Sequence, residues 1–324
     1  MTKLGICISP FMGLTLARLA EFAQESEDAG IEGIFIPEGK NDGLICCYAA
    51  AKATKRLVVA TWILNIFLRE PALCCWGARQ IAEETAGRFI LGLGVSHRPL
   101  LEDLGIRVPE PRARLRHYTH QLRNYLGRQD TSRPIEGSVP IYFAALALET
   151  VRLGAEIADG LMLDMCTINR LQKAAATAYD TLSSNGRSRA QFTITTGVPL
   201  FLHQDRGRAL IAAQRTLARY ASLPAYNRMF ARSGFAAEMT KVQAARDSIE
   251  DASAMITPTM IESVALIGTP VGWRDRFEAL AQAGADWVIV RPFAVDEDYE
   301  QSLHAAISAL ARLACPVRAQ RMER

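Results

Sequence analysis

Short hydrophobic runs alternate with amphipathic segments along most of this chain. The runs are rich in valine, isoleucine, leucine and phenylalanine, which is typical of parallel strands buried on both faces. Eight such runs predict strands at Leu4–Ser9, Gly33–Pro37, Leu57–Ile63, Phe89–Val95, Ile141–Leu146, Gly160–Met165, Phe192–His203 and Trp287–Pro292. A closed (β/α)8 TIM barrel requires eight parallel strands joined by helices. The pattern therefore predicts an α/β protein of this architecture.

The segments between the predicted strands carry apolar residues at helical spacing. Start signals precede several of them, such as Pro71 and Asp205, because these residue types favour the first positions of a helix. The predicted helices are Leu14–Ala29, Gly43–Ala53, Ala72–Thr85, Arg112–Leu126, Leu148–Ala158, Arg170–Leu182 and Arg206–Ala221. Since no low-complexity linker interrupts the alternation, we expect residues 1–324 to form a single domain.

The alternation stops between about residues 222 and 268. This stretch is first rich in aromatic residues and methionine and then rich in charge. We expect it to form helical insertions before the last strand. Two interpretations stay open: a lid over the cavity or an interface, or helices that only add packing.

Composition narrows the function classes only slightly. The chain has 324 residues, 49% of them hydrophobic, and a formal net charge of +3. This small excess gives no argument for nucleic acid or an anionic membrane surface. The longest nearly uncharged apolar run, Leu57–Leu68, is too short to span a bilayer, and no signal-like segment follows Met1. We expect a cytoplasmic protein that binds a small molecule, and neither nucleic acid nor a membrane.

The seven cysteines do not have the spacing of a metal site. Four form adjacent pairs in apolar helical segments, no C-x-x-C motif occurs, and no histidine lies near them. We expect buried free thiols and no bound metal. The cysteines are Cys7, Cys46, Cys47, Cys74, Cys75, Cys166 and Cys315.

Polar residues follow the fourth predicted strand at its carboxyl end, where the loops of a barrel converge on one cavity. Gly92 and Gly94 let the backbone approach a flat ligand or a phosphate. Ser96 and His97 follow directly. His97 suits a general acid because the pKa of histidine is near neutrality, although a hydrogen bond to a loop carbonyl explains it as well.

Three further candidates lie at the ends of other strands. Glu38 could orient a ligand hydroxyl, act as a base or cap a loop. Asp164 is a candidate for binding substrate. The small residues at Ala145–Ala147 leave room for a bulky planar ligand, or allow tight packing. No G-x-G-x-x-G fingerprint opens a strand–helix unit and no G-x-S-x-G elbow occurs, so neither a Rossmann site nor a serine hydrolase is supported.

Five arginines follow the fourth predicted strand within a short distance. They could hold the anionic tail of a cofactor, or they could cover a solvated helix face. These residues are Arg98, Arg107, Arg112, Arg114 and Arg116.

Several short sequence segments of the chain resemble those of a known family. These are Arg56–Thr61, Asn65 with the Arg69-x-Pro71 that follows it, Gly87–His97 and Ala155–Gly160. With them the chain resembles the luciferase-like monooxygenase superfamily, and within it the oxidoreductases that use the deazaflavin coenzyme F420.

The resemblance implies a barrel that holds an isoalloxazine-like ring at its carboxyl mouth. In relatives, a bulge with a non-prolyl cis peptide supports the ring, and here it would fall at Thr61, Trp62 and Ile63, most closely at the Trp62–Ile63 bond. Asn65 would neighbour the cofactor. The ring edge and the phosphate-bearing tail would contact two segments, Gly94, Val95 and Ser96 and then Ala145, Leu146 and Ala147.

The resemblance also implies catalytic positions. Glu38 stands where related dehydrogenases place an acidic residue near the ring, and His97 where some place a glutamate that donates a proton. Gly39 stands where some of them carry a catalytic histidine. Ala145–Ala147 lacks the glycine-rich turn that relatives share.

Three functions remain from this interpretation. The first is hydride transfer between coenzyme F420 and a small organic substrate. The second is an FMN-dependent monooxygenase that uses reduced flavin and dioxygen, and the third is a flavin-binding barrel without catalysis. Relatives are commonly dimeric, so we also expect a homodimer that uses the apolar helices at Gly43–Ala53 and Ala72–Thr85.

Overall fold

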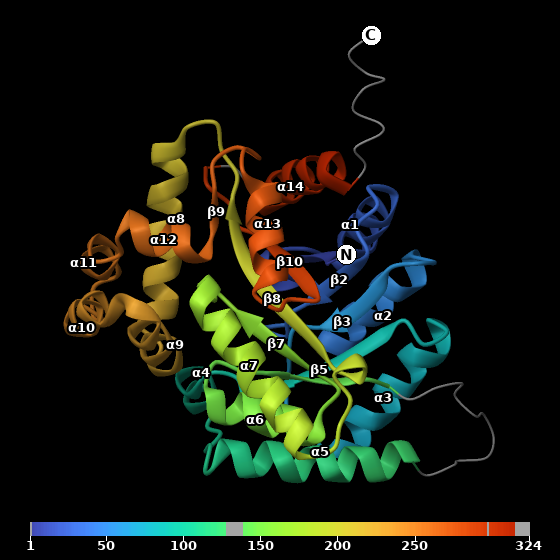
Figure 1. Ribbon diagram of the computed structural model, residues 1–324. Coiled ribbons are helices and arrows are strands. Elements are labelled where there is room, and N and C mark those ends of the chain that lie inside the picture. Colours follow the sequence, from blue (N-terminus) through green and yellow to red (C-terminus); the bar gives the residue numbers. More distant parts are fainter. Residues whose placement is uncertain (1, 128–138, 297, 315–324) are drawn as a thin grey trace.

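A computed structural model describes residues 2–127, 139–296 and 298–314. Within them, parallel strands form a closed barrel, because β10 pairs with both β1 and β8 (Figure 1). The barrel strands are β1 (Lys3–Cys7), β2 (Gly33–Ile36), β3 (Val58–Thr61), β5 (Phe89–Gly94), β6 (Ile141–Ala144), β7 (Gly160–Asp164), β8 (Thr193–Phe201) and β10 (Trp287–Pro292). They coincide with the predicted strands and confirm the (β/α)8 prediction.

Helices surround the barrel on its outer side. Those between barrel strands are α1 (Leu16–Asp28), α2 (Gly43–Ala53), α3 (Pro71–Glu84), α4 (Arg98–Asp103), α5 (Pro111–Gly127), α6 (Leu148–Ile157), α7 (Ile168–Ser184), α8 (Arg206–Ala221) and α13 (Trp273–Gln282), with α14 (Tyr299–Ala314) after the last strand. Short helical turns are η1 (Pro10–Met12) and η2 (Arg189–Gln191). The hydrophobic pattern did not single out α4, α13 or α14.

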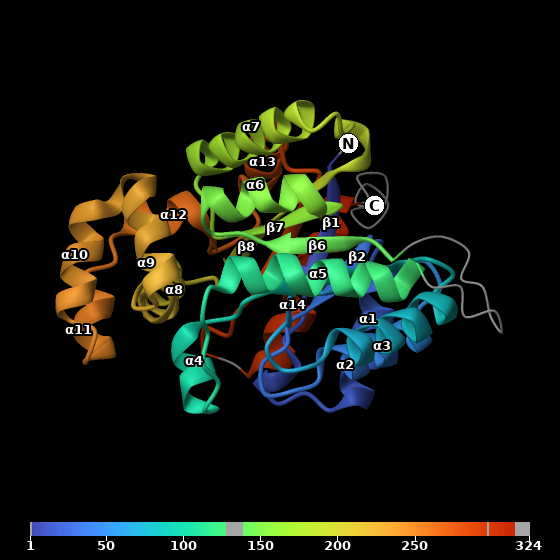
Figure 2. The same ribbon diagram turned by 90° about the horizontal axis from the view of Figure 1, so that it is seen from below.

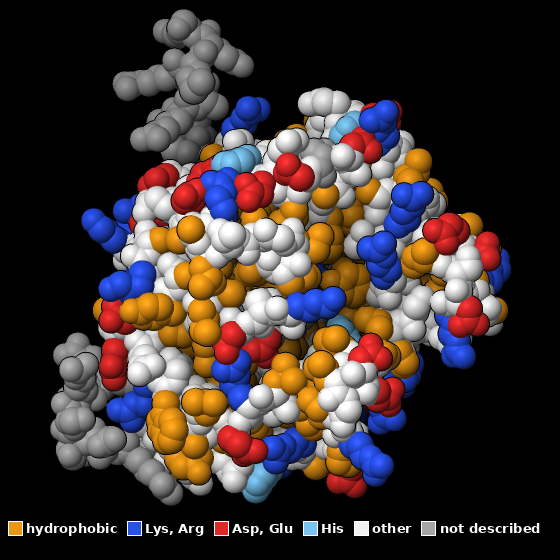
Figure 3. All heavy atoms as spheres, turned by 180° about the vertical axis from the view of Figure 1, so that it is seen from behind, with side chains coloured by type: hydrophobic (Ala, Val, Ile, Leu, Met, Phe, Trp, Pro, Cys, Tyr) orange, Lys and Arg blue, Asp and Glu red, His pale blue; other side chains and the backbone are white. Residues whose placement is uncertain are grey.

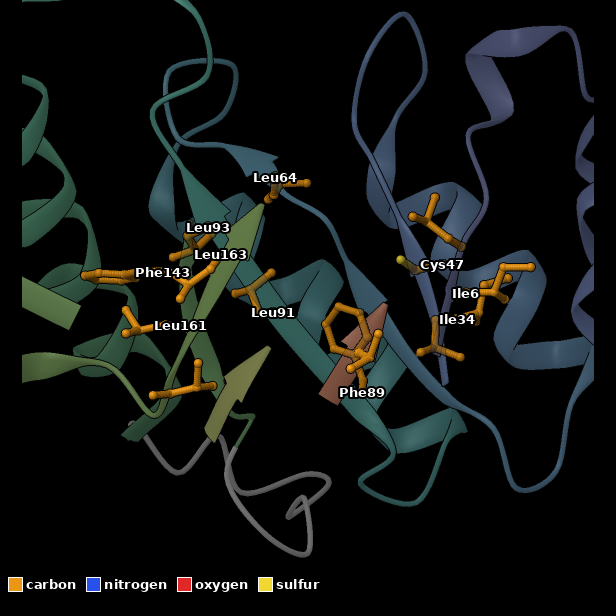
Figure 4. Packing of buried hydrophobic residues seen from close by; sticks show 14 of the residues in the cluster. Ile6, Ile34, Cys47, Leu64, Phe89, Leu91, Leu93, Phe143, Leu161 and Leu163 are labelled. Atoms are coloured by element: carbon orange, nitrogen blue, oxygen red, sulfur yellow. The ribbon is translucent and has the colours of Figure 1, made fainter. Parts of the chain in front are cut away.

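The barrel wall has an outer and an inner apolar layer. Successive side chains of a strand point to opposite faces, so Leu161 and Leu163 of β7 pack in the outer layer while Met162 lies inside. Figure 4 shows part of the outer layer, where side chains from β5, β6 and β7 fill the space between strands and helices. The inner cluster consists of Cys7, Phe35, Ala60, Trp62, Ile90, Tyr142, Met162, Trp287 and Ile289.

Helices separate β8 from β10, as predicted for residues 222–268. They are α9 (Pro224–Phe230), the π-helical turn η3 (Ala231–Phe235), α10 (Ala236–Ala244), α11 (Ile249–Ala254) and α12 (Pro258–Val264), followed by the short strand β9 (Leu266–Ile267). Together with α8 they stand beside the barrel (Figure 2). Their apolar faces enclose a second core, which includes Met229 and Phe230 and reaches Met165 at the barrel rim.

The strand predicted at Leu57–Ile63 is interrupted. β3 pairs Ala60 with Ile90, and pairing with β5 resumes in β4 (Leu64–Asn65), where Leu64 lies opposite Leu93. Three residues therefore face two on β5, which defines a β-bulge. The bulge and the cis peptide bond at Trp62–Ile63 are both confirmed.

The cysteines lie where the composition suggested. Six of them are buried and free, including the adjacent pairs on α2 and α3, while Cys315 lies outside the described residues. Burial raises the pKa of the Cys74 thiol to about 12. Within the described ranges, every helix is too short or too polar to cross a membrane.

Candidate active site

A buried ion pair lies at the carboxyl end of the barrel, on the inner face of its wall. Asp164 ends β7 and Arg291 lies near the end of β10, and both residues are at least nine-tenths buried. One Arg291 guanidinium nitrogen donates to Asp164 Oδ2. Figure 3 shows this end of the molecule hollowed, with hydrophobic side chains along the hollow and a histidine at its edge.

Two tyrosines join this ion pair to the inserted helices. The Tyr226 hydroxyl, from α9, donates to Asp164 Oδ2 at 2.8 Å. Arg291 donates to the Tyr220 hydroxyl, at the end of α8, also at 2.8 Å. The ring of Tyr220 lies edge-on to that of Tyr226, with centroids 5.0 Å apart. The segment predicted as an insertion at residues 222–268 therefore contributes Tyr226 to the mouth of the barrel, while Tyr220 comes from α8 just before it.

Trp62 meets the same ion pair above Gly197 of β8. A Cβ atom at position 197 would lie 2.3 Å from Asp164 Oδ1, 3.0 Å from Trp62 Cζ2 and 3.1 Å from Arg291 Cδ. Only a residue without a side chain leaves space for all three groups. Asp164 Oδ1 itself is buried and has no hydrogen-bond partner among the described residues.

His97 faces this cluster from the opposite wall. It follows Ser96, which has a positive φ of 55°, and it precedes the first turn of α4. Its ring centroid lies 5.6 Å from that of Tyr226. Burial lowers the pKa of His97 from its usual value, Arg291 adds to the effect, and Asp164 opposes it. The imidazole is therefore neutral at pH 7.

The bulge is fixed by contacts with β5. The Thr61 hydroxyl donates to the Gly92 carbonyl at 2.8 Å and accepts from the Gly92 amide at 2.9 Å. A Cβ at Gly92 would lie 2.2 Å from the Thr61 carbonyl oxygen, and one at Gly94 would lie 2.6 Å from Ile63 Cδ1. The bulge can pack this closely against β5 because Gly92 and Gly94 have no side chains. Val95 and Ser96 follow Gly94 and are half-buried.

Glu38 has both carboxylate oxygens engaged. Oε2 accepts from the backbone N–H of Asn65 at 2.8 Å, and Oε1 accepts from Arg69 at 2.8 Å and from the backbone N–H of Gly43 at 3.3 Å. Its side chain is 2% exposed. These contacts tie the end of β2 to β4 and to the start of α2.

The predicted tail segment lies between β6 and α6. The Ala145 amide donates to Met162 at 3.1 Å, and Ala147 precedes α6 without any side-chain cap. The Leu146 carbonyl accepts from Arg170 of α7 at 2.6 Å. Arg170 is 7% exposed and has no ion-pair partner within the part of the chain that the structure describes. A buried cation therefore lies next to the uncapped start of a helix.

The structure brings together some of the predicted residues and separates others. Trp62, His97 and Asp164 meet in one cluster, whereas Glu38 and Asn65 lie with Arg69 behind the bulge. Sequence reasoning did not identify four residues of these clusters: Arg170, Tyr220, Tyr226 and Arg291. No group of three or more side chains suited to a metal ion occurs among residues 2–127, 139–296 and 298–314.

A barrel with a polar cluster at its carboxyl mouth is the usual arrangement of a barrel enzyme. The sequence model of the luciferase-like monooxygenase family matches residues 3–287, and the chain belongs to this family. It is thus an oxidoreductase of the luciferase-like family, whose members use F420 or FMN.

Known proteins resemble the chain over nearly its whole length. A 5,10-methylenetetrahydromethanopterin reductase of Archaeoglobus fulgidus is 23% identical over 313 residues, which cover 89% of this chain and 92% of that protein. The structure of the coenzyme F420-dependent tetrahydromethanopterin reductase of Methanopyrus kandleri superposes with a TM-score of 0.79 at 18% identity. The match covers 95% of this chain and 98% of that chain. The structure of a type II Baeyer-Villiger monooxygenase of Pseudomonas putida in complex with FMN superposes with a TM-score of 0.67 at 15% identity, and the match covers 97% of each chain. The structural matches show the fold.

Proposed function

We propose that this protein is a deazaflavin-dependent oxidoreductase that transfers a hydride between coenzyme F420 and a small organic substrate. One observation carries the proposal: Trp62 of the bulge adjoins the cluster of Asp164, Arg291 and His97 at the barrel mouth. The relatives named above with F420 or methanopterin chemistry favour this cofactor, with FMN as the alternative.

The residues at the mouth fit a ring with polar edges. Asp164 Oδ1 is a buried acceptor without a donor, and such an atom costs about 1–3 kcal/mol unless a partner is supplied. Both a deazaflavin and a flavin carry an N–H group on the pyrimidine-like part of the ring. We assign the bulge, from Thr61 to Ile63, to the support of the ring, and Asp164 to hydrogen bonding with ring or substrate.

The segment at Ala145–Ala147 fits a phosphate. The positive end of the α6 dipole and the buried guanidinium of Arg170 act on the same place, and both favour an anion. Arg170 also fixes the Leu146 carbonyl, and so positions the turn. The arginine supplies charge where the glycine-rich turn of relatives is missing.

The remaining residues divide the chemistry between them. The bound cofactor would supply the hydride chemistry, and the barrel would supply orientation and exclusion of water. We assign proton transfer to His97, because it is the titratable group at the mouth without a hydrogen bond among those described. We assign Glu38 a positioning role, since its oxygens hold Asn65, Gly43 and Arg69.

Replacing His97 by alanine is expected to slow single-turnover oxidation by about 10²–10⁴-fold, the usual contribution of a general acid or base. Cofactor affinity should change little. Because the pKa of His97 lies below its usual value, the wild-type rate should change through a protonation below pH 6.5, and the variant should lack that step.

The matched control is His120→Ala, which removes an exposed histidine of α5. It should leave the rate and its pH dependence unchanged. Loss of cofactor binding in His97→Ala, with an unaltered rate in the bound fraction, would instead assign His97 a structural role.

We also propose that the protein is a homodimer. Ile45 and Tyr48 on α2 and Leu73 and Trp76 on α3 are large hydrophobic residues that are 43–59% exposed. α2 and α3 pack side by side, and hydrophobic side chains gather on this part of the surface at the lower left of Figure 3. Light scattering should give twice the chain mass of 35.6 kDa, and Trp76→Glu should halve it. A monomer at micromolar concentration would contradict the proposal.

A further inference from the structure

A pocket lies at the amino-terminal end of the barrel, opposite the mouth. Its lining includes Lys3, Val58 and Trp287, the first residues of β1, β3 and β10, and Glu32, which directly precedes β2. These four strands are neighbours in the barrel wall. Trp287 and Arg291 are four residues apart on β10, so the pocket lies about 13 Å from the ion pair at the mouth. It is thus separate from the candidate active site.

The pocket is large enough for a small molecule. Its volume is about 310 Å³, at the lower end of the range of small-molecule sites in proteins, about 300–1,000 Å³. Trp287 supplies its apolar side, together with Val58 and Ile31. The Trp287 ring is tightly packed, because it lies edge-on to Phe35 with centroids 5.6 Å apart and because a Cβ atom at Gly33 would lie 2.7 Å from Trp287 Cζ3. A fixed ring of this kind offers a flat apolar surface to a ligand.

One acidic group of the lining is already satisfied within the chain. The Glu27 side chain is 4% exposed. Its carboxylate accepts from the backbone N–H groups of Lys55, Arg56 and Leu57 at 2.6–3.2 Å. These hydrogen bonds compensate the burial of its charge, so Glu27 holds the start of β3 and does not serve a ligand.

The other three charged groups of the lining are exposed. The Lys3 ammonium group lies over the Trp287 ring, 5.2 Å from its centroid. The Arg56 side chain is 73% exposed. Glu32 Oε2 accepts from the backbone N–H of Leu4 at 2.9 Å, which orients the carboxylate. Charges of both signs therefore stand beside the apolar surface.

The formal charges of the lining cancel. Lys3 and Arg56 carry two positive charges, and Glu27 and Glu32 carry two negative charges. A ligand with a single charge would leave the pocket with a net charge, whereas a ligand with one charge of each sign keeps the balance. Complementary charges of both signs also fix the orientation of a ligand.

We infer that this pocket binds a small zwitterion with an apolar body, of the class of the α-amino acids with an aromatic side chain. The ligand carboxylate pairs with Lys3 and Arg56. Its ammonium group pairs with Glu32, and its ring packs on Trp287. The inference does not depend on the cofactor of the enzyme, because no group of the barrel mouth takes part.

Isothermal titration calorimetry of the full chain with three ligands of the same body tests the inference. Phenylalanine carries both charges, phenylpropionate lacks the ammonium group, and phenethylamine lacks the carboxylate. Phenylalanine should bind most tightly, and each of the other two should bind about two- to fivefold more weakly, as expected for the loss of one exposed ion pair. Absence of binding by phenylalanine at about 10 mM, or equal affinity for all three ligands, would overturn the inference.

Two variants that each remove one charge assign the contacts. Lys3→Met should weaken the binding of phenylalanine and phenylpropionate by about two- to fivefold and leave that of phenethylamine unchanged. Glu32→Gln should weaken the binding of phenylalanine and phenethylamine and leave that of phenylpropionate unchanged, and its amide oxygen can still accept from Leu4. If both variants bound all three ligands like the wild type, the pocket would not be the site.

Two further variants serve as controls. Lys173→Met, on an exposed lysine of α7, should bind all three ligands like the wild type. Titration with phenylalanine should also change the tryptophan fluorescence. Trp287→Phe, which keeps an aromatic ring, should remove that change while calorimetry still detects binding. A fluorescence change that persisted in Trp287→Phe would place the ligand elsewhere and overturn the inference.

Discussion

Replacing Arg291 by methionine is expected to lower the free energy of unfolding by about 3–5 kcal/mol, because it leaves the Asp164 carboxylate buried without its counter-ion. Tyr226 would remain as the only donor to the Asp164 carboxylate among the contacts described. Tyr220 would lose its donor as well. Urea unfolding followed by circular dichroism measures the effect.

The second half of this experiment adds Asp164→Asn to Arg291→Met. The neutral amide can still accept from the Tyr226 hydroxyl, and no unpaired charge remains. The double variant should therefore be more stable than Arg291→Met alone. The effects of the two substitutions on the free energy of unfolding would then not be additive, because the second substitution offsets part of the loss caused by the first. If the two losses added, Asp164 and Arg291 would not form the pair that the structure shows.

Replacing Glu38 by alanine is expected to cost about 3 kcal/mol of stability, because it leaves two backbone N–H groups and part of the half-buried Arg69 without their acceptor. Arg69 would keep Asp42, at 3.1 Å. Glu38→Gln retains the shape and one acceptor oxygen, and it should cost about half as much. Thermal and urea unfolding of both variants give the comparison.

The same pair of variants separates positioning from catalysis. If Glu38 positions the bulge, Glu38→Gln should weaken cofactor binding while the single-turnover rate of the bound complex changes by less than about tenfold. Asp42→Asn serves as the control. Asp42 also contacts Arg69, but among the contacts described it caps the start of α2 and does not contact the bulge. A rate loss of about 10²-fold or more in Glu38→Gln at unchanged affinity would make Glu38 the proton carrier.

Much of the fold follows from the sequence because the buried strands have a strong local signature. On β10, Val288 and Val290 face outward and Trp287 and Ile289 face inward. The same period of two places Arg291 on the inner face at the top of the barrel. This signal was available in the sequence, yet a charged residue inside a hydrophobic strand was not considered for the site.

Other features depend on contacts that no local pattern encodes. Tyr220 and Tyr226 reach the ion pair only because the end of α8 and the inserted helix α9 lie against the barrel mouth. Glu38 is a carboxylate at the rim, as predicted, but the acceptors that it supplies to Asn65 and Arg69 depend on the bulge between β3 and β4. The bulge itself was predicted from a family resemblance and not from hydrophobic periodicity, which favoured one continuous strand at Leu57–Ile63.

The most direct test of the account compares binding of coenzyme F420 and FMN to the wild-type protein, followed by single-turnover oxidation of each reduced cofactor with and without dioxygen. We predict tight binding of F420 and reoxidation that needs an organic acceptor and proceeds without dioxygen. Binding of FMN alone, with reoxidation that consumes dioxygen, would contradict the account.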